Sequence, residues 1–418
     1  MRALAIAEAA TGTTRRAARS GREDPFLATL RRFTFSGAPT IELQDAGLCY
    51  FVNEFWTAAQ RRGHNLHEIS YRACFKAQLP EFFVARLTDP GDTVYDPFAG
   101  RGTTPVQAAL MGRRPVSNDV NPLSAILIAP RLDPPPLPAI RARLDDLDLA
   151  HAVTEPDHPE LLAFYHPETL SQIIALRRHL LDREARGVLD PVDAWLRMVA
   201  INRLTGHSPG FFSVYTLPPN QAVSVQSQRR INLARGQTPP FRNVGALIAR
   251  KSRSLLADGA PPPHPAGLLT TGAAEATPGL ADASVDLLVT SPPFLDVVDY
   301  EGDNWLRCWF AGIDPATVRI DRHRDLPAWE RFVRRSFEEF ARVVRPGGFV
   351  AFEVGEVRHG RVLLERHVVA AIAGLPFQVL GVMVNQQSFT KTANCWGVHN
   401  NRGGTNTNRI VLLRRALV

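Results

Sequence analysis

The sequence predicts an α/β fold in which a parallel sheet is interrupted by a mostly helical inserted module. Strand-like apolar segments and amphipathic helix-like segments alternate in two separate stretches of the chain, as they do around parallel sheets. Proline clusters at 130–138 and 261–265 set these stretches apart from the arginine-rich segment between them, and proline runs are typical of linkers. We therefore divide the chain into a flexible N-terminal arm at 1–40, the first part of the sheet domain at 41–130, the inserted module at 131–266 and the second part of the sheet domain at 267–418.

Each element follows from a local pattern. Residues 79–87 form an amphipathic run that predicts a helix, and a strand, a glycine-rich turn and a helix at 104–111 follow, with Gly112 as the stop. The next strand ends at Asp119, so these elements form a β-α-β unit, which implies a parallel sheet. Past the module the predicted elements are a strand at 284–289, a helix at 327–345, a turn at 345–348, a strand at 349–354, a helix at 362–374 and strands at 377–384 and 409–414.

The composition indicates a soluble globular protein that is compatible with a nucleic-acid partner. Of its 418 residues 45% are hydrophobic and 21% charged, and no run of 18 apolar residues predicts a membrane span. The four cysteines lie far apart without C-x-x-C spacing, which argues against disulfides and metal sites and fits a reducing cytoplasm. The net charge is +7, and only three of the 48 basic residues are lysine. Arginine suits contacts to phosphate and guanine, although the codon usage of a GC-rich genome would produce the same excess of arginine over lysine.

The first chemical signal is the string Asp-Pro-Phe-Ala-Gly-Arg-Gly-Thr-Thr at 96–104, which follows the strand-like residues 92–95. Gly100 and Gly102 let the backbone turn sharply toward a small cofactor, and the next helix offers free N–H groups at its start. The string has neither G-x-G-x-x-G spacing nor a Walker lysine, and the Asp96 carboxylate disfavours a phosphate. Asp119 follows 23 residues after Asp96, where an acid binds ribose in such folds. S-adenosylmethionine, a cationic nucleoside, meets both demands; the alternative is an acid-capped turn without a ligand.

The second signal is Thr-Ser-Pro-Pro-Phe at 290–294, which follows the apolar residues 284–289. An exocyclic amine of a base is a poor nucleophile because its lone pair is delocalised into the ring, so a catalyst must hold both amine hydrogens. The Ser291 Oγ and the Pro292 carbonyl can accept those two hydrogen bonds. Pro293 stiffens the turn, and Phe294 can stack on the base, an interaction worth roughly 1–3 kcal/mol. Methyl transfer to the amine is then a displacement whose rate comes from positioning, although the string alone is also a common turn.

Together the two strings resemble those of the amino-methyltransferase family of site-specific DNA methyltransferases. The string at 96–104 resembles the cofactor motif, the string at 290–294 resembles the catalytic motif, and residues 67–80 resemble the segment that folds over the methionine moiety. The resemblance implies a Rossmann-like seven-stranded methyltransferase sheet, S-adenosyl-L-methionine as cofactor and a target base flipped out of double-stranded DNA. The implied catalytic residues are Ser291, Pro292, Pro293 and Phe294. The implied cofactor residues are Phe75, Asp96, Pro97, Phe98, Ala99, Gly100, Gly102, Thr103, Thr104, Asp119, Asn121 and Glu275.

Serine in the first catalytic position is more typical of cytosine-N4 enzymes of this family, and aspartate of adenine-N6 enzymes, so we expect cytosine N4. Carbon-5 methylation needs a cysteine nucleophile, usually after proline, and the sequence contains no Pro-Cys pair. Two features depart from the family. Gly272-Ala-Ala-Glu275 stands where a Gly-Asp-Ala-like string is usual, so either Glu275 contacts the adenine amine or that contact is missing. The inserted module also precedes this string, an order that fits none of the family's common arrangements cleanly.

Two segments are candidates for contact with DNA. Residues 226–253 contain seven basic residues, several amides and no acid, a combination that reads phosphates and base edges; a solvated helical face is the alternative. The polar loop at 385–408 joins the last two predicted strands, and a loop of this length is usually functional or disordered. In the fold that the resemblance implies, this loop would lie near the base pocket, so we expect it to contact the substrate. The basic candidates are Arg229, Arg230, Arg235, Arg242, Lys251, Arg253, Lys391 and Arg402.

The expected function is therefore a cytoplasmic bacterial DNA methyltransferase, and a restriction endonuclease is the kind of partner that the family implies. Adenine N6 is the alternative target. An RNA or glutamine methyltransferase would use the same chemistry, but such relatives more often carry Asn or Asp before Pro-Pro and lack a basic insert of this size. A DNA-binding protein with a decayed methyltransferase fold is the third alternative, and Ala273 leaves it open.

Overall fold

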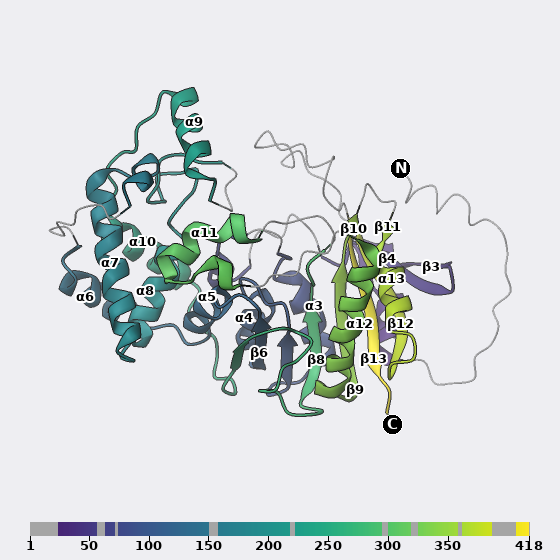
Figure 1. Ribbon diagram of the computed structural model, residues 1–418. Helices are drawn as coiled ribbons and strands as arrows, with labels where there is room; N and C mark the ends of the chain where they lie inside the picture. Colours follow the sequence, from purple (N-terminus) through teal and green to yellow (C-terminus); the bar gives the residue numbers. More distant parts are fainter. Residues whose placement is uncertain are drawn as a thin grey trace.

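The structure is a computed structural model that describes residues 24–56, 63–71, 74–149, 158–217, 222–294, 300–318, 325–357, 362–386 and 407–417. Figure 1 shows a sheet covered by helices on one side of the molecule and a helical module on the other. Among the described residues, no helix has the length and apolar content needed to cross a membrane.

One nine-stranded sheet organises the molecule. Its order is β3-β4-β12-β13-β9-β8-β5-β6-β7, and the five strands from β7 to β9 are parallel. The last strand of the chain, β13, lies between β9 and β12 and is antiparallel to both. The strands are β3 (Ile41–Asp45), β4 (Leu48–Asn53), β5 (Thr93–Asp96), β6 (Arg114–Asp119), β7 (Leu268–Thr271), β8 (Val285–Thr290), β9 (Val344–Val354), β12 (Phe377–Gln386) and β13 (Thr407–Arg415).

The predicted α/β class and Rossmann-like sheet are confirmed, with two more strands than expected. The seven strands from β7 to β12 make up the expected sheet, and β4 and β3 extend it beyond β12. Two short antiparallel pairs lie outside this sheet, β1 (Thr34–Phe35) with β2 (Ala38–Pro39) and β10 (Glu356–Val357) with β11 (Val362–Leu363).

Helices cover both faces of the sheet because its strands are apolar on both sides. One face packs against α12 (Leu326–Val343) and α13 (Leu364–Ala371), with Trp329, Phe337 and Phe340 fully buried. The other face packs against α2 (Pro25–Arg32), α3 (Gln78–Leu87) and α4 (Thr103–Leu110). The helix after β5 and the helix that precedes β9 thus lie on opposite faces, so the strand order changes direction between β5 and β8. Ligands of open α/β sheets bind outside the carboxyl ends of the strands at such a point.

The helical module has its own core and shares it with the sheet domain. Its helices are α6 (Leu137–Asp146), η3 (Pro159–Ala163), α7 (Pro167–Ala185), α8 (Pro191–Ile201), α9 (Val225–Arg235) and α10 (Val244–Leu255). They bury Trp195, Leu196 and Phe212 together with side chains of α5 (Leu123–Leu132) and α11 (Tyr300–Ala311). The short helices η1 (Asn65–His67) and η4 (Pro315–Thr317) complete the description.

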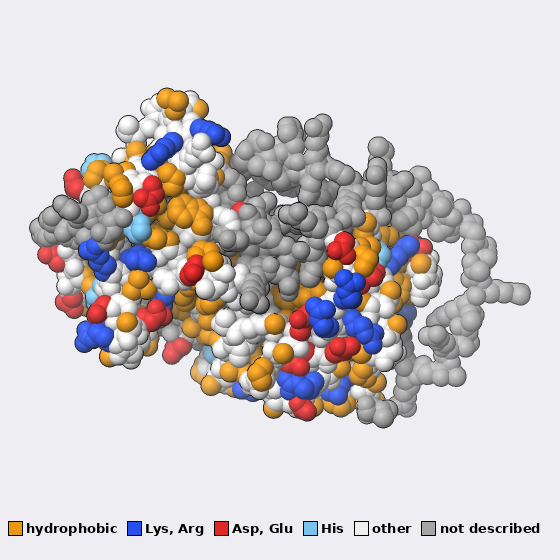
Figure 2. Space-filling view, in the orientation of Figure 1, with side chains coloured by type: hydrophobic (Ala, Val, Ile, Leu, Met, Phe, Trp, Pro, Cys, Tyr) orange, Lys and Arg blue, Asp and Glu red, His pale blue; other side chains and the backbone are white. Residues whose placement is uncertain are grey.

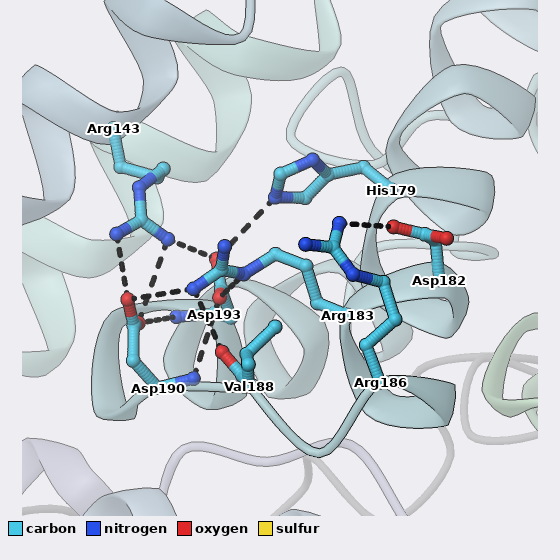
Figure 3. A network of polar contacts seen from close by, with 8 residues as sticks. All are labelled: Arg143, His179, Asp182, Arg183, Arg186, Val188, Asp190 and Asp193. Atoms are coloured by element: carbon cyan, nitrogen blue, oxygen red, sulfur yellow. Dashed lines mark hydrogen bonds and ion pairs between the residues drawn. The ribbon is translucent and has the colours of Figure 1, made fainter.

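An ion cluster fixes three helices of the module to one another (Figure 3). Asp190 caps the start of α8 in a capping box with Asp193, whose side chain is fully buried. Arg143 from α6 pairs with both carboxylates, and its Nη2 lies 2.6 Å from Asp190 Oδ2. Arg183 from α7 approaches the same two carboxylates from the other side. One buried and one half-buried carboxylate are therefore matched by two arginines, which suits a structural role.

The structure corrects three predicted boundaries. The N-terminal arm ends earlier than 40, because α2 starts at Pro25 and buries Phe26 and Leu30 against the sheet. Pro130 is not in a linker: it lies in the last turn of α5 and is buried, where its missing N–H affects a single helical bond. The turn expected at 345–348 is part of β9, which accommodates it through Gly347 at a φ of +78°. The helix α11 also packs into the module, although its residues belong to the second part of the sheet domain.

Candidate active site

A cavity of about 400 Å³ lies at the carboxyl ends of β5, β6, β7 and β8, a volume typical of small-molecule sites. The two strings that are about 190 residues apart in sequence meet in its wall. Ser291 therefore lies in the same cavity as Asp119, as the predicted chemistry requires. The predicted site residues that line the cavity are Phe75, Pro97, Phe98, Ala99, Gly100, Thr103, Asp119, Asn121, Glu275, Ser291 and Pro293.

The glycine turn is shaped by close packing under α4. Gly102 has a φ of +83° and precedes the first residue of the helix. A Cβ at this position would lie 2.3 Å from Ile128 Cγ1, so no other residue fits without a shift of α5. Gly100 has a φ of +52° but leaves ordinary space for a side-chain carbon, 3.6 Å from Tyr71. Gly102 is therefore a packing requirement of the turn and does not line the cavity.

Asp119 ends β6 and presents a carboxylate to the cavity. Its Oδ2 accepts the Gly100 N–H at 2.8 Å, and its Oδ1 accepts the Asn121 N–H at 2.9 Å. Burial raises the pKa of Asp119, while these two backbone bonds lower it. A carboxylate accepts about four hydrogen bonds, so each oxygen keeps capacity for a ribose hydroxyl. Asn121 in turn caps α5 by accepting the Leu123 N–H at 3.0 Å.

The segment from Gly272 to Glu275 forms the wall next to Asp119, where the resemblance places the cofactor's adenine. Asn118 on β6 fixes it by donating to the Gly272 carbonyl at 2.8 Å, and the Gly272 N–H donates to the Asp119 carbonyl. Glu275 lines the cavity, and its Oε1 pairs with Arg335 of α12. Glu275 thus lines the cavity with one oxygen already engaged, and its contact with an adenine amine stays a prediction.

Arg101, which the sequence analysis left unassigned, ties the segment before α3 to the glycine turn. Its guanidinium donates to the carbonyls of Ile69, at 2.7 Å, and Phe75, at 3.4 Å. Tyr71, Cys74 and Phe75 consequently line the cavity from this segment. That residues 67–80 fold over one end of the cofactor stays a prediction.

Asp96 does not face the cavity, contrary to expectation. It ends β5 fully buried, and its Oδ1 accepts the Thr290 hydroxyl at 2.5 Å and the Phe98 N–H at 3.1 Å. Burial raises the pKa of Asp96 to about 7, against the lowering effect of these bonds. Asp96 therefore joins the glycine turn to the strand that carries Ser291. Thr104 has a similar role, since its hydroxyl donates to the Val289 carbonyl at 3.1 Å.

The Ser-Pro-Pro-Phe turn is held from below by α12. The Trp329 indole donates to the Pro293 carbonyl at 3.0 Å, and Trp329 is fully buried. Ser291 and Pro293 line the cavity, and Pro292 is buried behind them. Phe294 was expected to stack on the base, but it packs against the core beside α12 and does not line the cavity.

Two other aromatic rings stand in the cavity wall. Phe98 and Phe332 both line it, and their ring centroids are 5.6 Å apart. Phe98 was predicted from the cofactor string, whereas Phe332 lies on the apolar face of α12, and the sequence pattern showed only a core residue there. Other lining residues that the sequence analysis did not assign are Tyr71, Cys74, Arg101, Val120, Gly272, Ala273 and Ala274.

The predicted DNA-contacting residues divide into exposed and engaged ones. Arg229, Arg230 and Arg253 are exposed, and the Arg235 guanidinium lies over the Tyr215 ring at 3.9 Å. Lys251 is a poor candidate, because its side chain is 11% exposed and its ammonium group pairs with Glu68 at 2.6 Å. Arg242 is half-buried at the start of α10. Lys391 and Arg402 lie outside the described residues.

The amides of the same region are engaged within the module. The side chains of Gln228 and Gln237 both donate to the Tyr215 carbonyl, at 3.1 and 3.0 Å, and both contact Asn232. Asn232 donates to the Ala163 carbonyl at 2.7 Å. These three amides hold α9 to the rest of the module, so they are not available to read base edges.

Comparisons with known proteins agree with the motifs. Residues 48–127 match the family model described as DNA methylase. The chain is similar to the type II methyltransferase M.BsoBI of Geobacillus stearothermophilus, with 23% identity over 296 residues, which is 63% of this chain and 56% of the relative. It is also similar to the type II methyltransferase M.MjaII of Methanocaldococcus jannaschii, with 36% identity over 69 residues, 16% of this chain and 13% of the relative. The match thus spans about half the length of M.BsoBI and a smaller part of M.MjaII.

Solved structures share little sequence with this chain. Geranyl diphosphate C-methyltransferase from Streptomyces coelicolor A3(2) is 10% identical, with a TM-score of 0.34 over 89% of this chain and 90% of that one. TrmN from Thermus thermophilus is 13% identical, with a TM-score of 0.31 over 82% of this chain and 50% of that one.

The residues of the cavity fit S-adenosylmethionine, the predicted cofactor. Asp119 can accept hydrogen bonds from a ribose, the Gly272–Glu275 wall can take an adenine, and Tyr71 and Phe75 add aromatic side chains to the lining. The comparisons bear out the resemblance for the first string: residues 48–127, which contain it, match the DNA methylase family model, and the chain is similar to two type II methyltransferases.

Proposed function

We propose that this chain is a DNA methyltransferase that transfers a methyl group from S-adenosylmethionine to an exocyclic base amine, N4 of cytosine. The observation that carries the proposal is the shared cavity: the Ser291 turn and the Asp119 wall face one space of cofactor size. When bound, the cofactor supplies an electrophilic methyl group on a sulfonium. The chain itself must hold the base in position for the transfer.

The Ser291 turn is built to hold an amine. The Ser291 hydroxyl and the Pro292 carbonyl provide two acceptors for the two amine hydrogens. The bond from Trp329 engages the neighbouring Pro293 carbonyl and so fixes the direction of the turn. The Asp96–Thr290 bond fixes the same turn relative to the glycine turn. The base nitrogen is thereby held in line with the methyl group while its lone pair stays free.

The projecting helix α9 supports a duplex DNA substrate. Figure 1 shows α9 at the top of the module, and the short strands β10 and β11 lie at the top of the sheet in the same view. The helix contains Arg229, Arg230 and Arg235 and no acidic residue, and Leu233 is 86% exposed beside them. Figure 2 shows basic and apolar side chains together at the tip over α9. Arginines that bind phosphate and an apolar side chain that can enter a base step are a combination that proteins use on duplex DNA.

Transfer of a labelled methyl group tests this function. The protein is incubated with labelled S-adenosylmethionine and genomic or mixed-sequence duplex DNA, and the modified base is identified by mass spectrometry. N4-methylcytosine is the expected product. N6-methyladenine would change the proposed target base and leave the rest of the proposed function in place. Ser291→Ala is the matched control, which should abolish transfer and keep cofactor affinity.

A parallel reaction with RNA separates the competing functions. Methylation of RNA in the absence of DNA methylation would show that the substrate is RNA and not DNA. Binding of duplex DNA without cofactor affinity would instead identify a DNA-binding protein with a decayed fold. The intact glycine turn and Ser-Pro-Pro-Phe turn, which line one cavity, argue against that outcome.

A further inference from the structure

A buried glutamate stands directly behind the catalytic serine. Glu353 lies on β9, the parallel neighbour of β8, and Thr290 pairs with Phe352 in the register of the two strands. Ser291 and Glu353 are the next residues along each strand, so they emerge side by side at the carboxyl edge of the sheet. Glu353 is 7% exposed, and no basic side chain of the described residues forms an ion pair with it, which is rare for a buried glutamate.

Two neutral groups face the Glu353 carboxylate. The Asn408 side-chain amide donates to it, and its Nδ2 lies 2.6 Å from Glu353 Oε1. The Ser291 hydroxyl, which the strand register places beside Glu353, is the second donor and also lowers its pKa. Burial raises the pKa of Glu353, and both hydrogen bonds act in the opposite direction by favouring the ionised form. Asn408 is the last residue of the loop that was expected to contact the substrate, whereas Glu353 was not assigned to the site from the sequence.

This contact decides which way the serine hydroxyl points. A free hydroxyl can rotate, and it can donate or accept. The base amine has only hydrogens to offer, so Ser291 can bind it only with a lone pair. A carboxylate is an acceptor, and once it takes the Ser291 hydrogen the serine oxygen has only lone pairs left for the amine.

We infer that Glu353 is a positioning residue that acts through Ser291: it orients the hydroxyl as an acceptor for the base and receives the proton that methylation releases. The inference rests on the proposed function and deepens it. As the nitrogen–carbon bond forms, the carbon–sulfur bond breaks and its electron pair stays on sulfur. The nitrogen, now cationic, gives one proton to Ser291 Oγ while the Ser291 hydroxyl proton passes to Glu353. The products are a neutral methylated amine, the thioether and a neutral Glu353, which later returns the proton to water.

Glu353→Gln keeps the shape of the side chain and removes the charge. We expect the turnover number to fall roughly 10²–10⁴-fold, the range for a lost acid–base contact, while the cofactor dissociation constant and the KM for DNA stay close to those of the wild type. Glu353→Asp should recover part of the rate because it keeps a carboxylate. Glu365→Gln is the matched control: Glu365 is also fully buried but pairs with Arg409, so its loss should alter stability and leave the rate unchanged.

The pH dependence of single-turnover methylation separates positioning from mere packing. In the wild type the rate should fall on the acidic side as Glu353 becomes protonated, and Glu353→Gln should abolish that limb. Asn408→Ala removes a bond that favours the ionised carboxylate, so it should move the acidic limb to higher pH even if Glu353→Gln folds poorly.

The outcomes are distinct for the two proposals. A wild-type protein that methylates no DNA overturns the proposed function and this inference with it. An active wild type whose Glu353→Gln variant keeps its turnover and its acidic limb, or whose Asn408→Ala variant leaves the limb in place, overturns the inference alone.

Discussion

Alanine at Gly102 should be among the most damaging small substitutions in the sheet domain. The left-handed backbone, with a φ of +83°, costs an ordinary residue roughly 1–2 kcal/mol. The new Cβ would also lie 2.3 Å from Ile128 Cγ1 and 2.9 Å from its Cδ1, and Ile128 is fully buried, so it cannot swing into solvent. Overpacking of this kind costs about 1–3 kcal/mol. The sum is a loss of about 2–5 kcal/mol in the free energy of unfolding.

Gly236→Ala provides the matched control. Its φ is +57° and no atom would lie within 4 Å of a new Cβ, so only the backbone cost of about 1–2 kcal/mol applies. Both variants are compared with the wild type by equilibrium denaturation followed by tryptophan fluorescence, and cofactor affinity is measured by titration calorimetry. We expect Gly102→Ala to lose about 1–3 kcal/mol more than Gly236→Ala and to bind the cofactor more weakly, because the turn must move. Equal losses in the two variants would refute the argument from crowding.

Three further predictions follow from the site. Asp119→Asn should weaken cofactor binding by about 10–100-fold, since hydrogen bonds to charged groups contribute about 1.5–3 kcal/mol; an unchanged dissociation constant in calorimetry would contradict this. The folded-state pKa of Asp96 is about 7 and its ordinary value is 3.8, so its ionisation removes stability as the pH rises through 7. The stability of Asp96→Asn relative to the wild type should therefore rise between pH 5 and pH 8 in denaturation experiments, and a constant difference would count against the burial of this charge. Replacing Arg229 and Arg230 by alanine should reduce the salt slope of DNA binding by roughly 2 in anisotropy titrations, whereas Arg331→Ala on the exposed face of α12 should not change it.

The sequence sufficed to locate the two chemical strings because each is defined by backbone requirements. Glycines at 100 and 102 and prolines at 292 and 293 restrict the chain locally, and the structure places both turns in one cavity. The strands of the sheet were predictable for a similar reason, since their apolar runs need burial on both faces. The helix predicted at 327–345 corresponds to α12, Leu326–Val343.

Side-chain direction could not be derived in the same way. Asp96 and Asp119 both end parallel strands, yet Asp96 turns toward Thr290 and only Asp119 faces the cavity. Phe294 turns into the core, and Phe332 from a distant helix stands in the cavity instead. Such choices depend on which neighbouring strand supplies a partner, and that information is absent from any local pattern. The same holds for Glu353, whose partners come from β8 and β13.

The two ends of the helical module meet at the edge of the sheet. Its entry follows Leu132, whose carbonyl lies 3.2 Å from the His264 ring, and Arg114 of β6 donates to the Ala266 carbonyl at 3.1 Å. The excursion between these points therefore starts and finishes at one place, and β6 and β7 can pair whatever folds in between. A chimaera with a foreign unit in place of residues 133–263 would preserve the strand order and pairing of the sheet, provided that the unit covers the apolar sides of α5 and α11. The module and the sheet are in this sense separately exchangeable parts.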